Sequence, residues 1–359
     1  MQQRVEWLDF IKVFGVLTTI FLHSNSVLYN FQTAMVSYPI EFNLNYWNIS
    51  VVFASLTGPS FALIFMYLGA RVFSSKITTF SHYMHKAKQL FLPLLFWSFF
   101  ALLFQMYIMH WSIDPITKLT KIITSPITNN LIILYLLIIV FLLTPLVKSF
   151  IKNKSMKQQF IIAIGWLLTM SMLLSLGYFF DFQIHILLIM SLSYLGFMQF
   201  GYLLTKIELT KRLLMLGLIL FIIGNLWTII GSIYSNQPED IVRGIYVNYY
   251  FSRISIPVII NSLGLFILLR YFAEKMMQRQ WFSSVTIHIS SVALGMCMVY
   301  TYWFVILGTE KIGIELTAFS GNPLWSVPLT ALLTIIGSML TVVIIKRIPY
   351  LHHVTPKLY

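Results

Sequence analysis

Ten hydrophobic segments, each near or above the length that crosses a lipid bilayer, constrain the fold of this 359-residue chain more than any other feature. A membrane-spanning α-helix needs about 20 mostly apolar residues, and it satisfies its own backbone polar groups in hydrocarbon. Charged residues make up only 10% of the chain, whereas soluble domains carry about 25%. We therefore predict an all-α, polytopic integral membrane protein of about ten transmembrane helices, near residues 7–29, 47–71, 89–109, 130–149, 159–178, 186–204, 213–235, 251–272, 285–308 and 326–345.

Lysine and arginine are divided unevenly between the connections that join these segments. Of the 24 cations, 18 lie in alternate connections and at the two ends, four lie in the other connections, and Lys12 and Arg253 lie inside predicted spans. The positive-inside rule assigns the richer side to the cytoplasm. An even number of spans puts both ends on one side, so both arguments predict cytoplasmic termini.

The remaining composition narrows the class of protein further. The chain runs into its first span without a small-residue cleavage pattern, so we expect that helix to belong to the fold. A single cysteine, Cys297, excludes an intramolecular disulfide framework. The net charge of +13 follows from topology, and we expect no nucleic-acid partner. No repeat, metal motif or separate soluble domain is visible, so residues 1–359 are predicted to form one transmembrane domain in a plasma membrane.

The first hydrophobic segment contains three ionisable residues, Asp9, Lys12 and His23. Ionisable groups in hydrocarbon are costly and usually mark a site or a pathway. Lys12 and His23 are eleven positions apart, which places them within roughly 20° of one helix face and about 16 Å apart along the axis. Asp9 and Lys12 then lie near the cytoplasm, where they can pair, and His23 lies in the outer half. The structural alternative is that Asp9 caps the helix, Lys12 extends to the headgroups and His23 bonds a neighbouring helix.

This segment, WLDFIKVFGVLTTIFLH, resembles the first helix of the acyltransferase 3 family of integral-membrane O-acyltransferases. The family pattern is Leu-Asp, then Arg or Lys, then ten residues, then His, and it falls here on Leu8, Asp9, Lys12 and His23. Four other segments resemble later family helices: FALIFMYLGARVF with Gly69, KAKQLFLPLLFW with Pro93, ILYLLIIVFLLTPLV with Pro145, and SSVALGMCMVY with Gly295.

The chain also departs from the family pattern at four positions. Leu68 stands where the family often has Ser, and Gly58 stands where it often has Arg. Asn130 replaces the His that opens the fourth helix, and Tyr300 replaces a late His. The first-helix residues are intact, and both a divergent substrate and a loss of activity are compatible with these differences.

The resemblance implies transfer of an acyl group, commonly acetyl from cytoplasmic acetyl-CoA, to a hydroxyl of a glycan or lipid-linked sugar at the outer face. His23 would act as general base or as covalent acyl carrier, and Lys12, paired with Asp9, would orient the anionic donor. No metal or prosthetic group is expected, and the partners would be membrane lipids and other surface-polysaccharide enzymes of a bacterial plasma membrane.

Cations near the cytoplasm are candidates for binding the phosphates of acyl-CoA, and ordinary positive-inside bias is the alternative. On the outer side Arg253 and Tyr250 are candidates for the acceptor, and an interfacial anchor with an aromatic belt is the alternative. The donor candidates are Lys76, Lys86 and Lys88, followed by Lys148, Lys152, Lys206, Lys211 and Arg212.

Two other function classes stay open. In a transporter or exporter of a surface-polysaccharide system, Asp9, Lys12 and His23 would form a proton or substrate path. In a catalytically inactive subunit of such a system, the fold would persist without affinity for acyl-CoA.

Overall fold

The computed structural model describes residues 6–25, 43–75, 79–108, 126–180, 186–237, 249–308, 316–317 and 320–356, and these residues form helices and connections without a strand. Ten helical segments among them are long and apolar enough to cross a membrane, which confirms the predicted all-α polytopic fold. The spans are α1 (Glu6–Ser24), α3 (Leu44–Thr57) with α4 (Ser60–Ser74), α5 (Phe80–Tyr107), α7 (Ile132–Ile151), α8 (Met156–Phe179), α9 (Ile186–Lys206), α10 (Lys211–Ser235), α12 (Ile256–Met276), α13 (Gln280–Leu307) and α14 (Pro323–Arg347), with short 3-10 helices η2 (Asn129–Leu131), η3 (Tyr249–Phe251) and η4 (Leu351–Val354).

Local sequence signals begin several of these helices. Ser155 caps α8, because its Oγ accepts from the Gln158 amide while Oε1 of Gln158 accepts from the Ser155 amide. Such reciprocal bonds satisfy amide groups that the first turn of a helix leaves free. Thr210 caps α10 and Asn322 caps α14 through their side-chain oxygens. These polar residues therefore set where the apolar spans begin.

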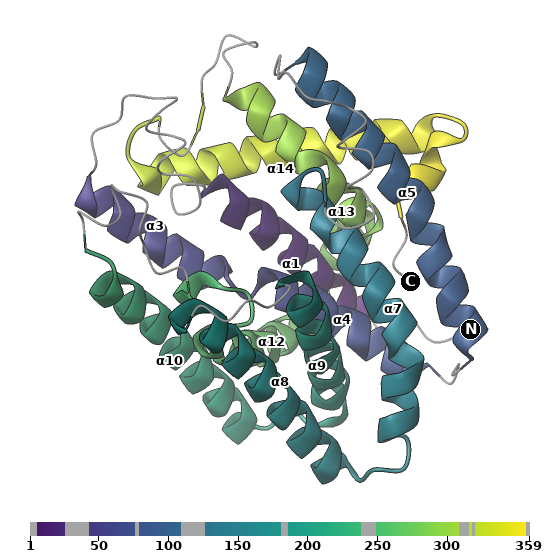
Figure 1. Cartoon of the computed structure of the whole chain (residues 1–359), viewed down its shortest axis with the longest axis vertical. Helices are drawn as coiled ribbons and strands as arrows, with labels where there is room; N and C mark the ends of the chain where they lie inside the picture. Colours follow the sequence, from purple (N-terminus) through teal and green to yellow (C-terminus); the bar gives the residue numbers. More distant parts are fainter. Residues whose placement is uncertain are drawn as a thin grey trace.

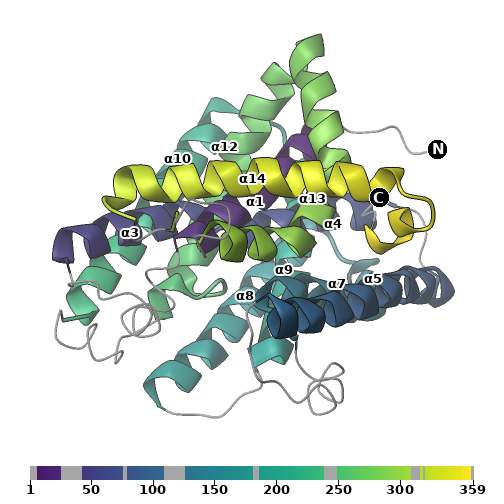
Figure 2. The same cartoon turned by 90° about the horizontal axis from the view of Figure 1, so that it is seen from above.

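Helix α1 occupies the interior of the bundle (Figures 1 and 2). It packs against α4, α12, α13 and α14, whereas α8 and α10 lie at the periphery and expose most of their apolar side chains. A helix surrounded by other helices can carry ionisable side chains out of contact with lipid, as membrane proteins require. The position of α1 therefore fits the unusual polarity of its sequence.

Helices α4 and α9 touch backbone to backbone at two glycines. A Cβ on Gly69 would lie 1.9 Å from the carbonyl oxygen of Met198, and one on Gly201 would lie 2.0 Å from that of Met66. Small residues at such contacts let membrane helices approach closely. Phe65 and Tyr194 also stack across this interface, with ring centroids 4.1 Å apart. This close contact with α9 thus fixes the orientation of α4, which also packs against α1.

The second span is interrupted, whereas we predicted one continuous segment at 47–71. Helix α3 ends at Thr57, Gly58 and Pro59 follow as a turn, and α4 begins at Ser60. Proline has no amide hydrogen and its ring crowds the preceding turn, so the helical hydrogen bonds stop there. The N-terminus of α4 consequently lies inside the bundle, where a Cβ on Gly15 of α1 would be 3.1 Å from the Ser60 carbonyl oxygen.

Basic residues cap two helix ends on the predicted cytoplasmic side. The Lys148 ammonium donates to the carbonyl oxygens of Val72 and Ser75, at 3.1 and 2.7 Å, at the C-terminus of α4. Arg270 donates in the same way to the carbonyl oxygens of Leu204 and Ile207 at the end of α9. Helix C-termini carry free carbonyls and partial negative charge, which cations stabilise. Lys148, a candidate for acyl-CoA binding, therefore has a structural role.

Candidate functional site

Five side chains from five parts of the fold meet around His23, and we call them the outer cluster: His23, Phe61, Tyr194, Arg253 and Tyr300. The His23 ring centroid lies 5.2 Å from that of Tyr300 and 6.4 Å from that of Phe61. The guanidinium carbon of Arg253 lies 3.9 Å from the centroid of the Phe61 ring. Arg253, which precedes α12, reaches His23 with Nη2 3.2 Å from Nε2. The structure thus brings the predicted base and the predicted acceptor-binding cation into contact.

The hydrogen bonds of His23 define its tautomer. Nδ1 lies 2.8 Å from the Thr19 carbonyl oxygen, which can only accept, so Nδ1 carries a hydrogen. Nε2 faces the guanidinium of Arg253, which can only donate, so Nε2 carries none. The imidazole is therefore neutral, and its basic nitrogen points into the outer cluster.

The two tyrosine hydroxyls of the outer cluster are buried, and neither donates a hydrogen bond to another described residue. Tyr194 is 0% exposed and Tyr300 is 1% exposed. The Tyr194 hydroxyl lies beside the Arg253 guanidinium, which can only donate, so the hydrogen of this hydroxyl stays unused. An unsatisfied buried hydroxyl costs about 1–3 kcal/mol, so such groups in a native fold need an explanation.

Arg253 carries the positive charge of the outer cluster. No Asp or Glu carboxylate of the described residues lies within ion-pair distance of it. Charged groups removed from water are normally paired or bound to an ion. Here the neighbours are the Phe61 ring, a neutral imidazole and the Tyr194 hydroxyl, which leave the charge uncompensated.

The N-terminus of α4 lies beside the outer cluster, because Phe61 is the second residue of this helix. No side chain caps this end. Gly58 and Pro59 form a turn between α3 and α4, and the Leu63 amide donates to the Pro59 carbonyl oxygen. The N-terminus of a helix carries partial positive charge and attracts anions. The start of α4 therefore adds to the field of Arg253.

The opposite end of α1 holds a second group, the inner cluster, made of Asp9, Lys12, Tyr67, Arg71 and Ser290. Asp9 lies 3.5 Å from Nη2 of Arg71 and accepts a 2.7 Å hydrogen bond from Ser290 Oγ. The charged ends of Lys12 and Arg71 lie 5.7 and 5.9 Å from the centroid of the Tyr67 ring. Asp9 and Lys12 are 3% and 6% exposed. We predicted Lys12 as the partner of Asp9, and the structure places Arg71 within ion-pair distance of this carboxylate.

The other predicted residues lie outside both clusters. Tyr250 packs against Gly231 of α10, and its hydroxyl accepts a 3.4 Å hydrogen bond from Ser235. Lys86 and Lys88 were expected in a connection, but α5 already begins at Phe80, so both lie in its first turns, on the predicted cytoplasmic side. Lys76 lies outside the described residues.

Three functional candidates escaped the sequence analysis: Arg71, Phe61 and Tyr194. Arg71 was attributed to positive-inside bias, although it stands four residues after Tyr67 on one face of α4. That helical spacing was the available signal. Phe61 and Tyr194 look like ordinary aromatic core residues, and only tertiary contacts reveal them.

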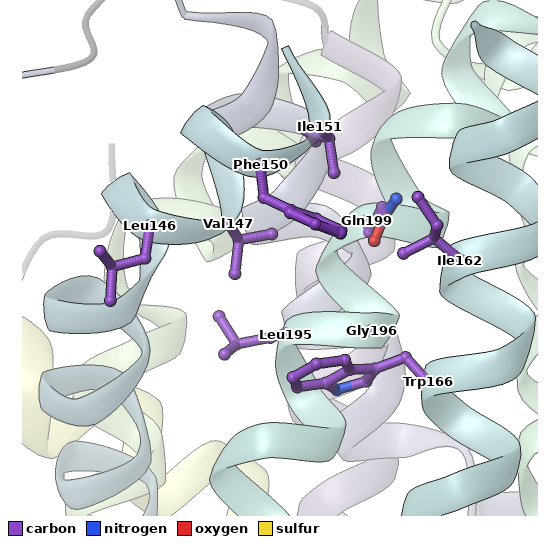
Figure 3. Close-up of a pocket in the computed structure, with 9 residues that line it drawn as sticks. All are labelled: Leu146, Val147, Phe150, Ile151, Ile162, Trp166, Leu195, Gly196 and Gln199. Atoms are coloured by element: carbon purple, nitrogen blue, oxygen red, sulfur yellow. The ribbon is translucent and has the colours of Figure 1, made fainter. Parts of the chain in front are cut away.

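A cavity of about 260 Å³ lies between α7, α8 and α9 (Figure 3). None of its lining residues belongs to the outer or inner cluster, and apart from Gln199 and the indole of Trp166 they offer no polar side chain. The Gln199 amide donates to the Gln159 carbonyl oxygen and is thereby occupied. The lining consists of Leu146, Val147, Phe150, Ile151, Ile162, Trp166, Leu195, Gly196 and Gln199.

Within the described residues, no group of three His, Cys, Asp or Glu side chains is placed to hold a metal ion. Comparisons with protein-family models, curated proteins and solved structures find no match for this chain. The chemistry of the two clusters is therefore the basis for a functional assignment.

Proposed function

We propose that this protein is a membrane-bound O-acyltransferase that moves an acyl group, acetyl in the simplest case, from cytoplasmic acyl-CoA to a hydroxyl of a glycan or lipid-linked sugar. The observation that carries the proposal is His23, held neutral with its basic Nε2 directed into a polar cluster inside the bundle. A neutral, oriented imidazole is the commonest general base in enzymes.

The proposed reaction uses His23 and the acceptor hydroxyl directly. Nε2 takes the hydroxyl proton as the oxygen attacks the thioester carbonyl, the carbon–sulfur bond breaks, and the CoA thiolate leaves and receives that proton. The bond from Nδ1 to Thr19 keeps the ring oriented throughout. Positioned general bases contribute about 10²- to 10⁴-fold to rates.

The inner cluster suits the donor end of this reaction. Lys12 and Arg71 place two cations beside one carboxylate on the predicted cytoplasmic side, and acyl-CoA brings several phosphates. The thioester of acyl-CoA stands at the end of a long flexible arm. One bound acyl-CoA therefore has its phosphates at the inner cluster and its thioester deeper in the bundle. Lys86 and Lys88 on α5 are further candidates for phosphate contact.

The test is transfer of label from radiolabelled acetyl-CoA into saccharide, in membrane vesicles with the cytoplasmic face exposed. His23→Ala should abolish labelling at matched protein level, while His288→Ala, which removes an exposed histidine, should leave it unchanged. Full labelling by a folded His23→Ala protein would refute the assignment. If neither protein labels saccharide, longer acyl-CoAs are tested before acyl transfer is abandoned.

A second candidate function, export of a saccharide or its precursor, is favoured by the interrupted second span. Transporters place the ends of broken helices at substrate sites inside the membrane, and α4 begins beside the outer cluster. Vesicles without acyl-CoA distinguish the two functions. Accumulation of a labelled saccharide would support export, whereas strict dependence of saccharide labelling on acyl-CoA would support transfer.

A further inference from the structure

We propose that the outer cluster binds an anionic group, a carboxylate or phosphate, through Arg253, the hydroxyls of Tyr194 and Tyr300 and the N-terminus of α4. Binding then draws Arg253 away from Nε2 of His23. The anion site stands on the geometry of the cluster alone, and the release of His23 rests on the proposed acyl transfer.

The first step of the argument is charge. Arg253 is half-buried against Phe61 and has no carboxylate of the described residues within ion-pair distance. Desolvating a guanidinium without an anion is unfavourable, because buried charges require pairing. An incoming anion would supply the missing partner and could bind in the two-pronged geometry that guanidinium groups favour.

The second step is the kind of hydrogen-bonding group that the cluster offers. Arg253 can only donate, and the hydroxyls of Tyr194 and Tyr300 have hydrogens that no described acceptor takes. The first turn of α4, which no side chain caps, adds the partial positive charge of a helix N-terminus. Donors that converge without acceptors fit a ligand rich in oxygen acceptors, which carboxylates and phosphates are.

The third step concerns His23. Its Nε2 already accepts from Arg253, so it cannot take a proton from a hydroxyl in this arrangement. An anion would bond Arg253 more strongly than a neutral imidazole does and would free Nε2, because the attraction between opposite charges adds to the hydrogen bond. An anion on the acceptor would therefore activate the base and position the hydroxyl in one event.

Two sources could supply the anion, a carboxylate on the sugar or the phosphate of a lipid carrier. Binding to the purified protein in lipid nanodiscs, without acyl-CoA, separates them. Glucuronic acid is compared with glucose, and farnesyl phosphate is compared with farnesol, by isothermal titration calorimetry. At least one anion should bind at least about tenfold more tightly than its neutral counterpart, as expected for charge-assisted hydrogen bonds.

Variants then locate the site. Arg253→Gln should weaken anion binding about tenfold or more and Arg253→Lys should weaken it less, because lysine keeps the charge but loses the planar fork. Arg212→Gln, which removes an exposed cation at the start of α10, is the matched control and should bind as wild type does. The double variant Tyr194→Phe/Tyr300→Phe removes only hydroxyls that donate to no described residue and keeps the test valid if Arg253→Gln misfolds.

The outcomes separate this inference from the proposed function. Three results would overturn the anion site. The charged and neutral probes could bind equally, or neither anion could bind. Alternatively, folded Arg253→Gln and the double tyrosine variant could both bind the anion as wild type does. Anion binding that is lost in Arg253→Gln supports the site even if wild type transfers no acyl group. Acyl transfer by wild type to a neutral acceptor as fast as to its anionic counterpart would overturn the release of His23 while leaving acyl transfer itself established.

Discussion

At the inner end of α1, Asp9 lies against Arg71 and accepts from Ser290, whereas at the outer end Arg253 faces His23 and two tyrosine hydroxyls without a carboxylate among the described residues. The charged side chains of both clusters are largely shielded from water, so each cluster carries a desolvation cost. The inner cluster offsets its cost by internal pairing and joins α1, α4 and α13. The outer cluster leaves hydrogen-bonding capacity unused, which is typical of a site that awaits a ligand.

The helix ends on the predicted cytoplasmic side extend this contrast. Lys148 and Arg270 donate hydrogen bonds to the carbonyl groups at the ends of α4 and α9. Cations gathered by the positive-inside rule can thus serve as helix caps, since helices that end in the cytoplasm present their negative ends there. A cation count alone therefore overstates how many residues are free for an anionic substrate.

The largest loss of stability is expected from Asp9→Ala. It leaves the half-buried Arg71 without the buried carboxylate of Asp9, and breaking a buried pair costs about 3 kcal/mol or more. Unfolding of the purified protein in mixed micelles, titrated with dodecyl sulfate, measures the change. Glu6→Ala is the control, because this exposed carboxylate on the same helix bonds Ser283 alone among the described residues. Equal losses in both variants would show that the inner cluster contributes no special stability.

Lys148→Met is expected to cost about 2 kcal/mol, since three hydrogen bonds from a charged donor disappear. Its ammonium donates to Val72, Ser75 and the Tyr83 hydroxyl, the last at 3.1 Å. Lys152→Met, one turn further and exposed, should change stability little. The same unfolding titration applies, and a Lys148→Met protein as stable as Lys152→Met would refute the capping role.

His23→Ala should lower stability by only about 1 kcal/mol, because it removes one bond to a backbone carbonyl and one to a partly exposed arginine. Together with the expected loss of saccharide labelling, this small cost would separate a functional role from a structural one. A loss as large as that of Asp9→Ala would place His23 among the residues that hold the helices together.

The transmembrane fold was predictable because hydrophobicity over about 20 residues is a local property. All ten spans coincide with helices, and Lys12 and His23 indeed share α1. The interruption at Gly58 and Pro59 was missed because the surrounding residues are apolar on both sides, so the hydropathy signal continues across the break. The early start of α5 was missed because its first turns are polar and look like a connection.

The candidate site was predictable only in part. Asp9, Lys12 and His23 stand out because polar residues in an apolar helix are visible in the sequence. Their partners are set by packing between helices far apart in the chain: Arg71 lies 62 positions from Asp9, and Arg253 lies 230 from His23. Helix periodicity predicts neighbours within one helix and says nothing about which helices meet.

The smallest effect on stability is expected from Tyr300→Phe, and it gives the sharpest comparison between the two regions. The Tyr300 hydroxyl is buried without a partner, so its removal should change stability by less than about 0.5 kcal/mol or even increase it. Tyr83→Phe is the matched variant near the cytoplasmic end, where the lost hydroxyl accepts from Lys148, and a cost of about 1 kcal/mol is expected. Anion binding should show the reverse order, weakened by Tyr300→Phe and unchanged by Tyr83→Phe. If Tyr300→Phe proved the more destabilising, its hydroxyl would have a partner inside the fold, and the case for a ligand there would rest on Arg253, Tyr194 and the N-terminus of α4.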